Sequence, residues 1–334
     1  MIGALGVLRK RAGGASSRFP AMRAVTIDDG SLSVEEHGDP EPGAEQILVR
    51  VAGAGINGAD ILQRKGAYPA PPGAPADIPG LELAGEVVQL GPGAERFAEG
   101  DRVMAIVGGG GQAELAVLHE RAAMPIPEGL DLVTAGGAAE VFTTAHDALF
   151  TQAGLRPGER LLVHGGAGGV GTAAVQLGRM AGARVTATVR REELREPVAE
   201  LGAEAIDPEG FADRGPFDVV LELVGAPNIS GDVKALAPGG RIVVIGVGAG
   251  FKAEVNLLAL MGKSATIRAS TLRARPLEDK AAAMRAVERE VLPHFGSGAL
   301  KVPIAETFPL EEVEAAYDRF TAGGKLGKVV LVTS

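Results

Sequence analysis

The pattern of apolar and polar positions divides the chain into two kinds of region. From Met22 to about Glu140, short apolar runs are separated by Gly- and Pro-rich turns such as Pro-Glu-Pro-Gly at 40–43. This pattern predicts a compact antiparallel β unit with strands at 22–27, 46–52, 82–90 and 102–107. From Val141 strands alternate with helices, and strands are predicted at 161–163, 184–189, 219–224, 241–246 and 266–270. Such alternation predicts a parallel sheet wound by right-handed crossovers.

Beyond about Arg275 the pattern predicts a helix at 279–291, a strand-like segment at 305–308, a helix at 310–320 and a strand at 328–332. We expect these elements to return the chain to the first unit. The prediction is a disordered extension at 1–21, a β-rich domain made of 22–140 with 275–334, and a nucleotide-binding domain at 141–274 inserted between its halves. The length of 334 residues agrees with two domains, because a single hydrophobic core rarely grows so large.

The strongest local signal is an apolar strand that breaks into a glycine loop and opens a helix. Residues 161–171 read Leu-Leu-Val-His-Gly-Gly-Ala-Gly-Gly-Val-Gly, with Gly166, Gly168 and Gly171 at G-x-G-x-x-G spacing. The first glycine of such a motif allows a tight turn, the second lets backbone N–H groups approach phosphates, and the third lets helix pack on strand. A dinucleotide site is therefore predicted, the alternative being an ordinary strand–helix turn with spare glycines. Its predicted cofactor contacts are Gly166, Ala167, Gly168, Gly169, Val170 and Gly171.

The end of the next strand indicates which dinucleotide is bound. A free ribose 2′-hydroxyl is usually held by Asp or Glu about 20 residues beyond the glycine loop. This chain has Thr188, Arg190 and Arg191 there, and no carboxylate ends the strand. Because guanidinium groups pair with a 2′-phosphate, NADP(H) is predicted over NAD(H), with these three residues as contacts. The alternative is that both arginines pair with Glu192 and Glu193 on a solvated helix start.

Composition excludes several classes of protein. The chain has no cysteine, which excludes disulfides, a thiolate nucleophile and Cys-ligated zinc, and which fits a cytoplasmic protein. A net charge of −9 without a basic stripe argues against nucleic-acid binding, and no apolar run reaches the roughly 18 residues that span a bilayer. The first 21 residues are basic, so they represent a transit peptide or an extension from an upstream start codon, and we favour the latter.

Four separated motifs occur in a familiar order: Ala-Gly-Ile-Asn-Gly-Ala-Asp at 54–60, Pro-Gly-Leu-Glu-Leu-Ala-Gly at 79–85, the loop at 161–171, and Gly-Gly-Lys-Leu-Gly-Lys at 323–328. From about Met22 to Leu331 the chain resembles the zinc-independent medium-chain dehydrogenase/reductase superfamily, in its quinone oxidoreductase (zeta-crystallin-like) branch. Residues 171–183 are similar to those of p53-inducible quinone reductases. The resemblance implies an α/β fold in which a Rossmann doubly wound parallel sheet is inserted into a GroES-like β-rich catalytic domain. It also implies NADPH in the cleft between them, and a homodimer.

The same resemblance shows what this chain lacks. Zinc-dependent relatives carry a Cys ligand near the position of Asn57 and a Gly-His-Glu motif where this chain has Gly80, Leu81 and Glu82. The five histidines, at 37, 119, 146, 164 and 294, have no short-range ligand spacing. No catalytic metal is therefore predicted.

Reduction without a metal favours acceptors that spread negative charge, such as quinones and activated alkenes. The resemblance implies that Asn57 donates to a quinone oxygen or positions the nicotinamide, the alternative being a turn-forming Asn before Gly58. It also implies that Tyr68 lies at the mouth of the site, where a phenol can donate or stack. Asp60 is predicted as a third catalytic residue, with a scaffold role left open. A tyrosine that some quinone reductases carry is Leu62 here, so their substrate range is not carried over.

Further cofactor contacts follow from the resemblance. Thr144 is expected near the pyrophosphate or nicotinamide. Gly246 and Val247, at the end of a central strand, are expected at the nicotinamide ribose. Lys328 is expected to reach the cofactor as well, although lysines that flank strands are usually solvated.

The predicted function is an NADPH-dependent, metal-free reductase that transfers hydride to a quinone or an α,β-unsaturated carbonyl compound. An enoyl-thioester reductase is one alternative, but it needs a basic groove that the acidic balance does not support. The other is a non-catalytic NADPH-binding or sensor protein.

Overall fold

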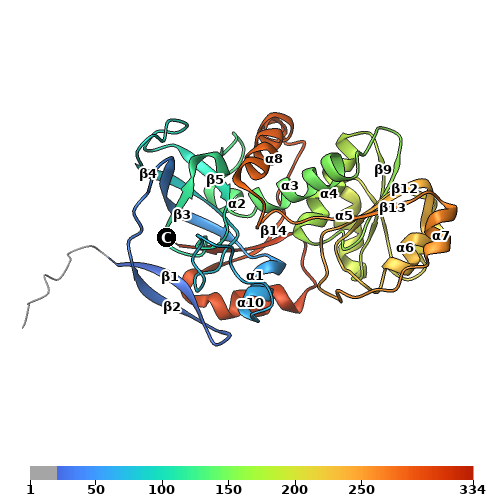
Figure 1. Cartoon of the computed structure of the whole chain (residues 1–334), viewed down its shortest axis with the longest axis horizontal. Coiled ribbons are helices and arrows are strands. Elements are labelled where there is room, and N and C mark those ends of the chain that lie inside the picture. The colour runs from blue at the N-terminus through green and yellow to red at the C-terminus, as the bar shows by residue number, and fades with distance from the viewer. Residues whose placement is uncertain (1–20, 334) are drawn as a thin grey trace, which may run out of the picture.

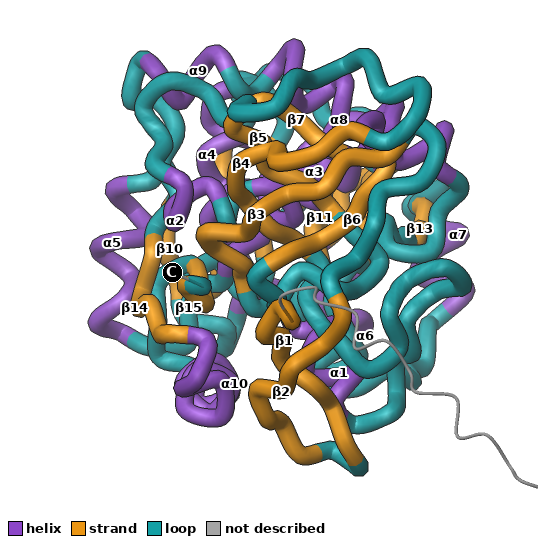
Figure 2. The backbone as a smooth tube through the Cα atoms, turned by 90° about the vertical axis from the view of Figure 1, so that its left-hand side faces the viewer, coloured by secondary structure: helices purple, strands orange, loops and turns teal. Residues whose placement is uncertain are grey.

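The computed structural model describes residues 21–333, so the extension predicted at 1–21 lies outside the described residues except for Ala21. Ala21 begins β1 (Ala21–Asp28), which forms an antiparallel hairpin with β2 (Ser31–Gly38). The turn between them has positive φ at both Asp29 and Gly30, as tight hairpins require. Helix α10 (Val313–Ala322) packs against this hairpin from the other end of the chain, and both lie below the large sheet in Figure 2.

The larger sheet joins the two ends of the described chain. Its strand order is β14–β15–β3–β4–β5–β7, and β6 pairs with β3 off this path. All pairings are antiparallel except β14 with β15. The strands are β3 (Gln46–Gly55), β4 (Glu82–Leu90), β5 (Arg102–Ile106), β6 (Leu115–His119), β7 (Ala123–Pro125), β14 (Ile304–Pro309) and β15 (Lys328–Val332). The predicted antiparallel unit and the predicted return of the C-terminal strand are thus confirmed.

The second sheet is parallel throughout and has the order β10–β9–β8–β11–β12–β13. In sequence this is third, second, first, fourth, fifth and sixth strand, the doubly wound order of dinucleotide-binding sheets. The order reverses between β8 and β11, and sheets of this kind bind ligands beyond the carboxyl ends of the strands at such a reversal. The strands are β8 (Arg160–Val163), β9 (Arg184–Thr188), β10 (Glu204–Ile206), β11 (Phe217–Glu222), β12 (Leu236–Val244) and β13 (Thr266–Ala269). The predicted Rossmann-type α/β fold is confirmed.

Helices cover both sheets. They are α1 (Gly58–Arg64), α2 (Leu132–Ala135), α3 (Ala139–His146), α4 (Gly169–Met180), α5 (Arg195–Glu200), α6 (Ile229–Ala235), α7 (Leu257–Gly262), α8 (Leu277–Glu290) and α9 (Pro293–Gly296), besides α10. A π-helix continues α3 at Asp147–Gln152, and single turns of 3₁₀-helix occur at Glu120–Ala122, Glu192–Leu194, Phe211–Arg214 and Leu310–Glu312. No helix within residues 21–333 is long and apolar enough to cross a membrane.

One apolar core runs through both sheets, and α3 is its central element. Val141 and Phe142 of α3 lie in the same buried cluster as Val49 of the antiparallel sheet and Leu161 of the parallel one. Figure 1 shows α3 and α4 between the two sheets, with the red C-terminal segments beside the blue N-terminal strands. This packing places the glycine loop against the antiparallel sheet. The domain boundaries at 140/141 and 274/275 stay a prediction.

The structure corrects several predicted bounds. Strand β12 begins at Leu236 rather than 241, although residues 238–240 read Pro-Gly-Gly and predict a turn. The chain accommodates them within the strand through a positive φ at Gly239 and a shift of register against β11. The helix predicted from 310 opens as a 3₁₀ turn and becomes α-helical only at Val313.

Candidate active site

The glycine loop turns at Gly165, not at Gly166 as predicted. Gly165 has φ +66°, the left-handed conformation that glycine adopts freely. Gly166 instead lies against β9, where an added Cβ would come within 2.7 Å of the Ala187 Cβ. The G-x-G-x-x-G spacing is as predicted, but the residue that needs a left-handed backbone conformation is Gly165, one position before the motif.

The other two glycines of the motif have different surroundings. A Cβ on Gly171 would lie 2.3 Å from the Gly165 carbonyl oxygen, so this position packs helix α4 tightly on the loop. A Cβ on Gly168 would make an ordinary contact with the Gly165 carbonyl oxygen at 3.4 Å, so this position is not crowded. Helix α4 has no side-chain cap, and the first N–H groups of a helix have no intrahelical acceptor. These N–H groups and the helix dipole suit an anion.

Beneath this loop lies what we call the loop-supporting network, formed by His164, Thr188, Glu222 and Asp232. His164 Nδ1 lies 3.1 Å from the Thr188 hydroxyl and its Nε2 lies 2.8 Å from Asp232 Oδ1. The same hydroxyl accepts from the Gly165 N–H at 3.3 Å. Thr188 therefore supports the turn of the glycine loop, and its hydroxyl is occupied by protein partners. Its predicted contact with the cofactor stays a prediction.

Two carboxyl oxygens of this network, Glu222 Oε2 and Asp232 Oδ2, are buried without a hydrogen-bond partner. Burial raises the pKa of Glu222, the His164 ring opposes that rise, and the Asp232 carboxylate adds to it. His164, Glu222 and Asp232 are the one group of potential metal donors within 4.8 Å of one another in the described part of the chain. Because both His164 nitrogens already have protein partners, we interpret the group as a buried hydrogen-bonding network.

Cations without carboxylate partners surround the glycine loop. Among residues 21–333, Arg190 and Arg191 form no ion pair, so the alternative pairing with the neighbouring glutamates is not seen. A Cβ on Gly323 would lie 3.5 Å from the Arg190 guanidinium, and one on Gly324 3.7 Å from that of Arg191. The segment 323–327 therefore lies next to both arginines.

Lys325, which was not predicted as a site residue, belongs to this same segment. The Gly327 N–H donates to the Ala167 carbonyl at 2.8 Å, which ties the segment to the glycine loop. Burial, and then the nearby Lys328 and Arg319, lower the pKa of Lys325 to about 8. Its ammonium contacts the Gly327 carbonyl and the Phe320 ring. A half-buried cation next to other cations is stabilised by a bound anion.

Gly246 and Val247 follow the carboxyl end of β12, as predicted. A Cβ on Gly246 would lie 2.2 Å from the Leu223 carbonyl oxygen, so this loop must pass directly over the end of β11. Val247 is 39% exposed at the same edge of the sheet. Both therefore border the crevice at the strand-order reversal, where their predicted contact with the nicotinamide ribose stays a prediction.

The other wall of the cleft holds what we call the cleft network, formed by Asn57, Asp60, Glu82, Glu140 and Lys328. The buried Lys328 ammonium lies 2.7 Å from Glu82 Oε1, from Asn57 Oδ1 and from the Ile56 carbonyl oxygen. Asn57 Nδ2 donates to the Gly55 carbonyl at 3.1 Å and to Glu82 Oε1 at 3.0 Å. All polar hydrogens of both side chains are thus engaged within the protein.

This geometry revises two predicted roles. The Asn57 amide has no free N–H to donate to an acceptor oxygen, and its observed partners hold Glu82 and Lys328 in place. The Lys328 ammonium is likewise turned away from solvent, while its stem passes Gly169, whose added Cβ would lie 2.7 Å from Lys328 Cδ. Lys328 therefore links the glycine loop to the cleft network. Direct contact of either residue with a ligand stays a prediction.

Asp60 has the geometry of a scaffold residue, the role left open above. It is fully buried, and its two oxygens accept the N–H groups of Asn57 at 2.8 Å and Gly80 at 3.1 Å. The first of these bonds belongs to a capping box at the start of α1. Burial raises the pKa of Asp60 to about 6 despite these bonds and the nearby Lys328.

Glu140, in the first turn of α3, was not predicted as a site residue. Its backbone N–H donates to Glu82 Oε2 at 2.9 Å, and its Oε1 accepts from the Thr144 hydroxyl at 3.3 Å. Its Oε2 is buried without a partner. Burial, and then the Glu82 carboxylate, raise the pKa of Glu140 to about 7. The available sequence signal was a single carboxyl within the apolar and small-residue stretch that opens α3.

Tyr68 lies at the edge of the cleft network and is held by Arg273. The Arg273 guanidinium carbon lies 5.1 Å from the centre of the Tyr68 ring, and its NH1 donates to the Tyr68 carbonyl at 3.0 Å. Burial raises the pKa of Tyr68, the Arg273 charge opposes that rise, and the Glu140 carboxyl adds to it. Tyr68 and Glu140 are therefore close enough to interact electrostatically.

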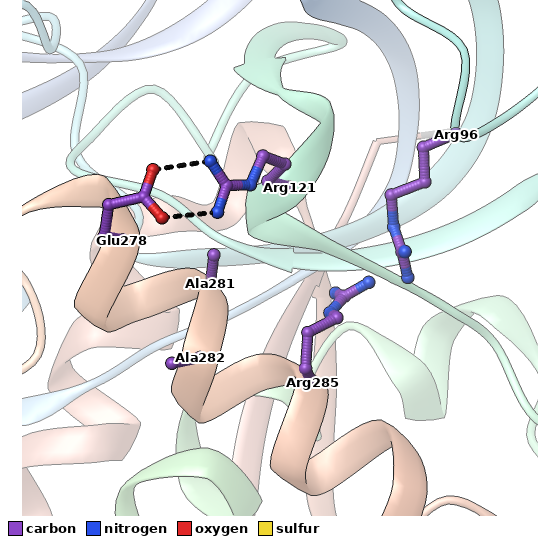
Figure 3. A pocket seen from close by; sticks show the side chains of 6 residues that line it. All are labelled: Arg96, Arg121, Glu278, Ala281, Ala282 and Arg285. Carbon is purple, nitrogen blue, oxygen red and sulfur yellow. Dashed lines mark hydrogen bonds and ion pairs between the residues drawn. The ribbon is translucent and has the colours of Figure 1, made fainter.

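The pocket in Figure 3 is separate from this site. Arg96, Arg121 and Arg285 line it together with Glu278 and two alanines of α8. Arg121 donates to both oxygens of Glu278 at 2.6 Å, while Arg96 and Arg285 each lie 2.7 Å from Glu288. The pairs of Arg121 and Arg96 fasten α8 to connections of the antiparallel sheet, whereas the pair of Arg285 with Glu288 lies within α8 itself. None of the predicted site residues lines the pocket.

Comparisons with known proteins agree with this architecture. Residues 43–128 match the family model of the alcohol dehydrogenase GroES-like domain, and residues 201–331 match that of the zinc-binding dehydrogenase. The quinone oxidoreductase of Rattus norvegicus is 32% identical over 306 residues, which span 88% of this chain and 91% of that protein. A human synaptic vesicle membrane protein VAT-1 homolog-like protein has a TM-score of 0.81 at 25% identity, covering 95% of this chain and 99% of that one.

A cobalt- and zinc-bound alcohol dehydrogenase from Pyrobaculum aerophilum also matches, with a TM-score of 0.80 at 27% identity over 93% of this chain and 99% of that chain. The residues of this cleft do not fit such a metal. Leu81 is apolar, the Asn57 oxygen already accepts from an ammonium, and that ammonium places a positive charge beside Glu82. The fold, the glycine loop and the relatives together show that the chain belongs to the medium-chain dehydrogenase/reductase superfamily and is an oxidoreductase related to quinone oxidoreductases.

Proposed function

We propose that this protein is an NADPH-dependent reductase of quinones or of α,β-unsaturated carbonyl compounds. One observation carries the proposal: the uncapped N-terminus of α4 adjoins segment 323–327, which contains Lys325 and lies against Arg190 and Arg191. Within residues 21–333 none of these three cations forms an ion pair with a carboxylate. An anion of several charges balances this site. Reduced nicotinamide, when bound there, supplies the hydride.

The preference for NADPH over NADH rests on the two arginines. Both are exposed, neither forms an ion pair within the described residues 21–333, and both follow the strand whose end usually carries the carboxylate that holds a 2′-hydroxyl. In this proposal they bind the 2′-phosphate, while Lys325 and the N–H groups of α4 bind the pyrophosphate.

The choice of acceptor rests on the polar groups of the cleft. The Tyr68 phenol provides a hydrogen-bond donor and the Arg273 guanidinium a positive charge beside it, while the charge of Lys328 is balanced by Glu82. This set suits an acceptor whose developing charge is delocalised. We assign Tyr68 to the acceptor and Asn57 to positioning Lys328 and Glu82.

The test is NADPH oxidation by the purified protein with a panel of ortho- and para-quinones, enones and an enoyl thioester, beside NADH. We expect turnover with quinones or enones. The double variant Arg190→Ala with Arg191→Ala should raise the KM for NADPH at least tenfold and leave the KM for NADH unchanged. Tenfold corresponds to about 1.4 kcal/mol of binding free energy. Glu99→Gln, at an exposed position, serves as control. Turnover with the thioester alone, or NADPH binding without turnover, would replace this proposal by one of its two alternatives.

We also propose that the protein is a homodimer. Strand β13 is an edge of the parallel sheet, and the adjacent α7 exposes three large apolar side chains, Leu257, Leu258 and Met261, by 67 to 77%. An unpaired edge beside an apolar patch favours association with a second copy. Sedimentation should show a dimer that Leu258→Glu dissociates and Glu99→Gln does not. Cytoplasmic location stays a prediction.

A further inference from the structure

Among residues 21–333, Glu140 is the carboxyl of the cleft network with an oxygen that has no hydrogen-bond partner. Its Oε2 is buried and has no hydrogen-bond partner, whereas Oε1 accepts from Thr144. Asp60 differs, because backbone N–H groups occupy both of its oxygens. Glu82 is likewise fully used by Asn57, Lys328 and the Glu140 N–H.

The surroundings of Glu140 keep a proton on it near neutral pH. Glu82, from β4, and Asp60, from α1, repel a second negative charge, while Lys328, from β15, attracts it. On the cleft side Tyr68, Arg273 and Lys280 of α8 lie within electrostatic range. Burial adds to the repulsion, and together they raise the pKa of this carboxyl to about 7.

Reduction of a quinone or an enone requires such a proton. The acceptor gains two electrons with the hydride, and the product is neutral only after one proton joins its oxygen or carbon. We propose that Glu140 is the general acid of this reaction, giving its carboxyl proton to the reduced acceptor beside Tyr68. The carboxyl O–H bond breaks, its electron pair stays on Glu140, the new O–H or C–H bond forms on the acceptor, and Glu140 regains a proton from water. This inference rests on the proposed function.

The decisive variant is Glu140→Gln, which keeps shape and polarity but has no acidic proton. We expect kcat with the best acceptor to fall about a hundredfold, as general-acid contributions commonly do, and the affinity for NADPH to change less than twofold. In the wild type kcat should be constant at low pH and fall tenfold per pH unit above about 7, because the acid must be protonated. That limb should vanish in Glu140→Gln and persist in Glu140→Asp, which also guards against a folding defect. Glu99→Gln is the matched control.

A second readout needs no turnover. The carboxyl band in infrared difference spectra of the protein without cofactor, titrated around pH 7, should be lost in Glu140→Gln and kept in Glu99→Gln. If the wild type is active and Glu140→Gln changes neither the pH profile nor the infrared band, the inference is overturned and the proposed function is not. A wild type that binds NADPH but reduces no acceptor would overturn the proposed function, and this inference with it.

Discussion

The two buried polar networks of this protein differ in how their charged groups are paired. In the cleft network the Lys328 ammonium makes three close contacts, and Glu140 Oε2 has no hydrogen-bond partner among residues 21–333. In the loop-supporting network two carboxyls share one histidine, and an oxygen of each has no partner. The first is centred on a lysine ammonium, and in the second burial disfavours the charged form of Glu222. The first should therefore suffer most from loss of a partner, and the second least from neutralisation of a carboxyl.

The largest effect is expected for Lys328→Met. Removing the ammonium leaves Glu82 buried and unpaired, which typically costs about 3–5 kcal/mol of unfolding free energy. Urea denaturation measures the loss, and Lys328→Met combined with Glu82→Gln should regain much of it. A loss below about 1 kcal/mol would show that the network does not depend on this charge.

A pH dependence of stability should follow from Asp60. Burial raises the pKa of its carboxyl to about 6 from 3.8, so the folded state binds more protons than the unfolded state between these values. Unfolding free energy should therefore fall as the pH rises through about 4 to 6, by on the order of 3 kcal/mol. Urea midpoints at pH 4 and pH 7 measure this. The opposite slope, with Asp60→Asn unchanged from the wild type, would contradict it.

Thr188→Val should have a smaller effect, because it removes one hydroxyl and keeps the shape. The Gly165 N–H and His164 lose a buried partner, which costs about 1–2 kcal/mol, and the glycine loop should loosen enough to weaken NADPH binding. Denaturation and fluorescence titration with NADPH measure the two effects. Weaker binding at unchanged stability would instead support direct contact of Thr188 with the cofactor.

The smallest effect is expected for Glu222→Gln. Its amide oxygen can keep the bonds from the Val224 and Gly225 N–H groups, and the network loses a carboxyl whose pKa is raised by burial. A raised folded-state pKa disfavours folding once the pH exceeds the unfolded-state value, so the variant should gain up to about 1 kcal/mol at pH 8 and less at pH 5. Thermal unfolding at both values tests this, and a strong loss at either would show that the charge itself is needed.

Much of the fold was predictable from local pattern. The bounds of β4 and β15 and the strand–loop–helix at 160–180 follow from runs of apolar residues and from glycine spacing. The doubly wound order of the parallel strands was implied by the family resemblance, and β10 was not predicted. These signals are local, because strand and helix periods and turn chemistry act within a few residues. The shift of the turn from Gly166 to Gly165 shows their limit, since φ angles depend on how β9 packs beneath the loop.

By itself the sequence determined most of the element types, the G-x-G-x-x-G loop and the position of Arg190 and Arg191 after the next strand, whereas the structure decided that these arginines form no ion pair within residues 21–333. Only the tertiary structure decided which polar groups of the cleft are free. Lys328 reaches Asn57 across 271 positions, and that contact removes both from the set of available donors. The same packing buries Asp60 on its backbone partners and leaves an oxygen of Glu140 unpartnered. The physical reason is that burial and long-range contact set the protonation and availability of a side chain, and neither is written in its neighbours along the chain.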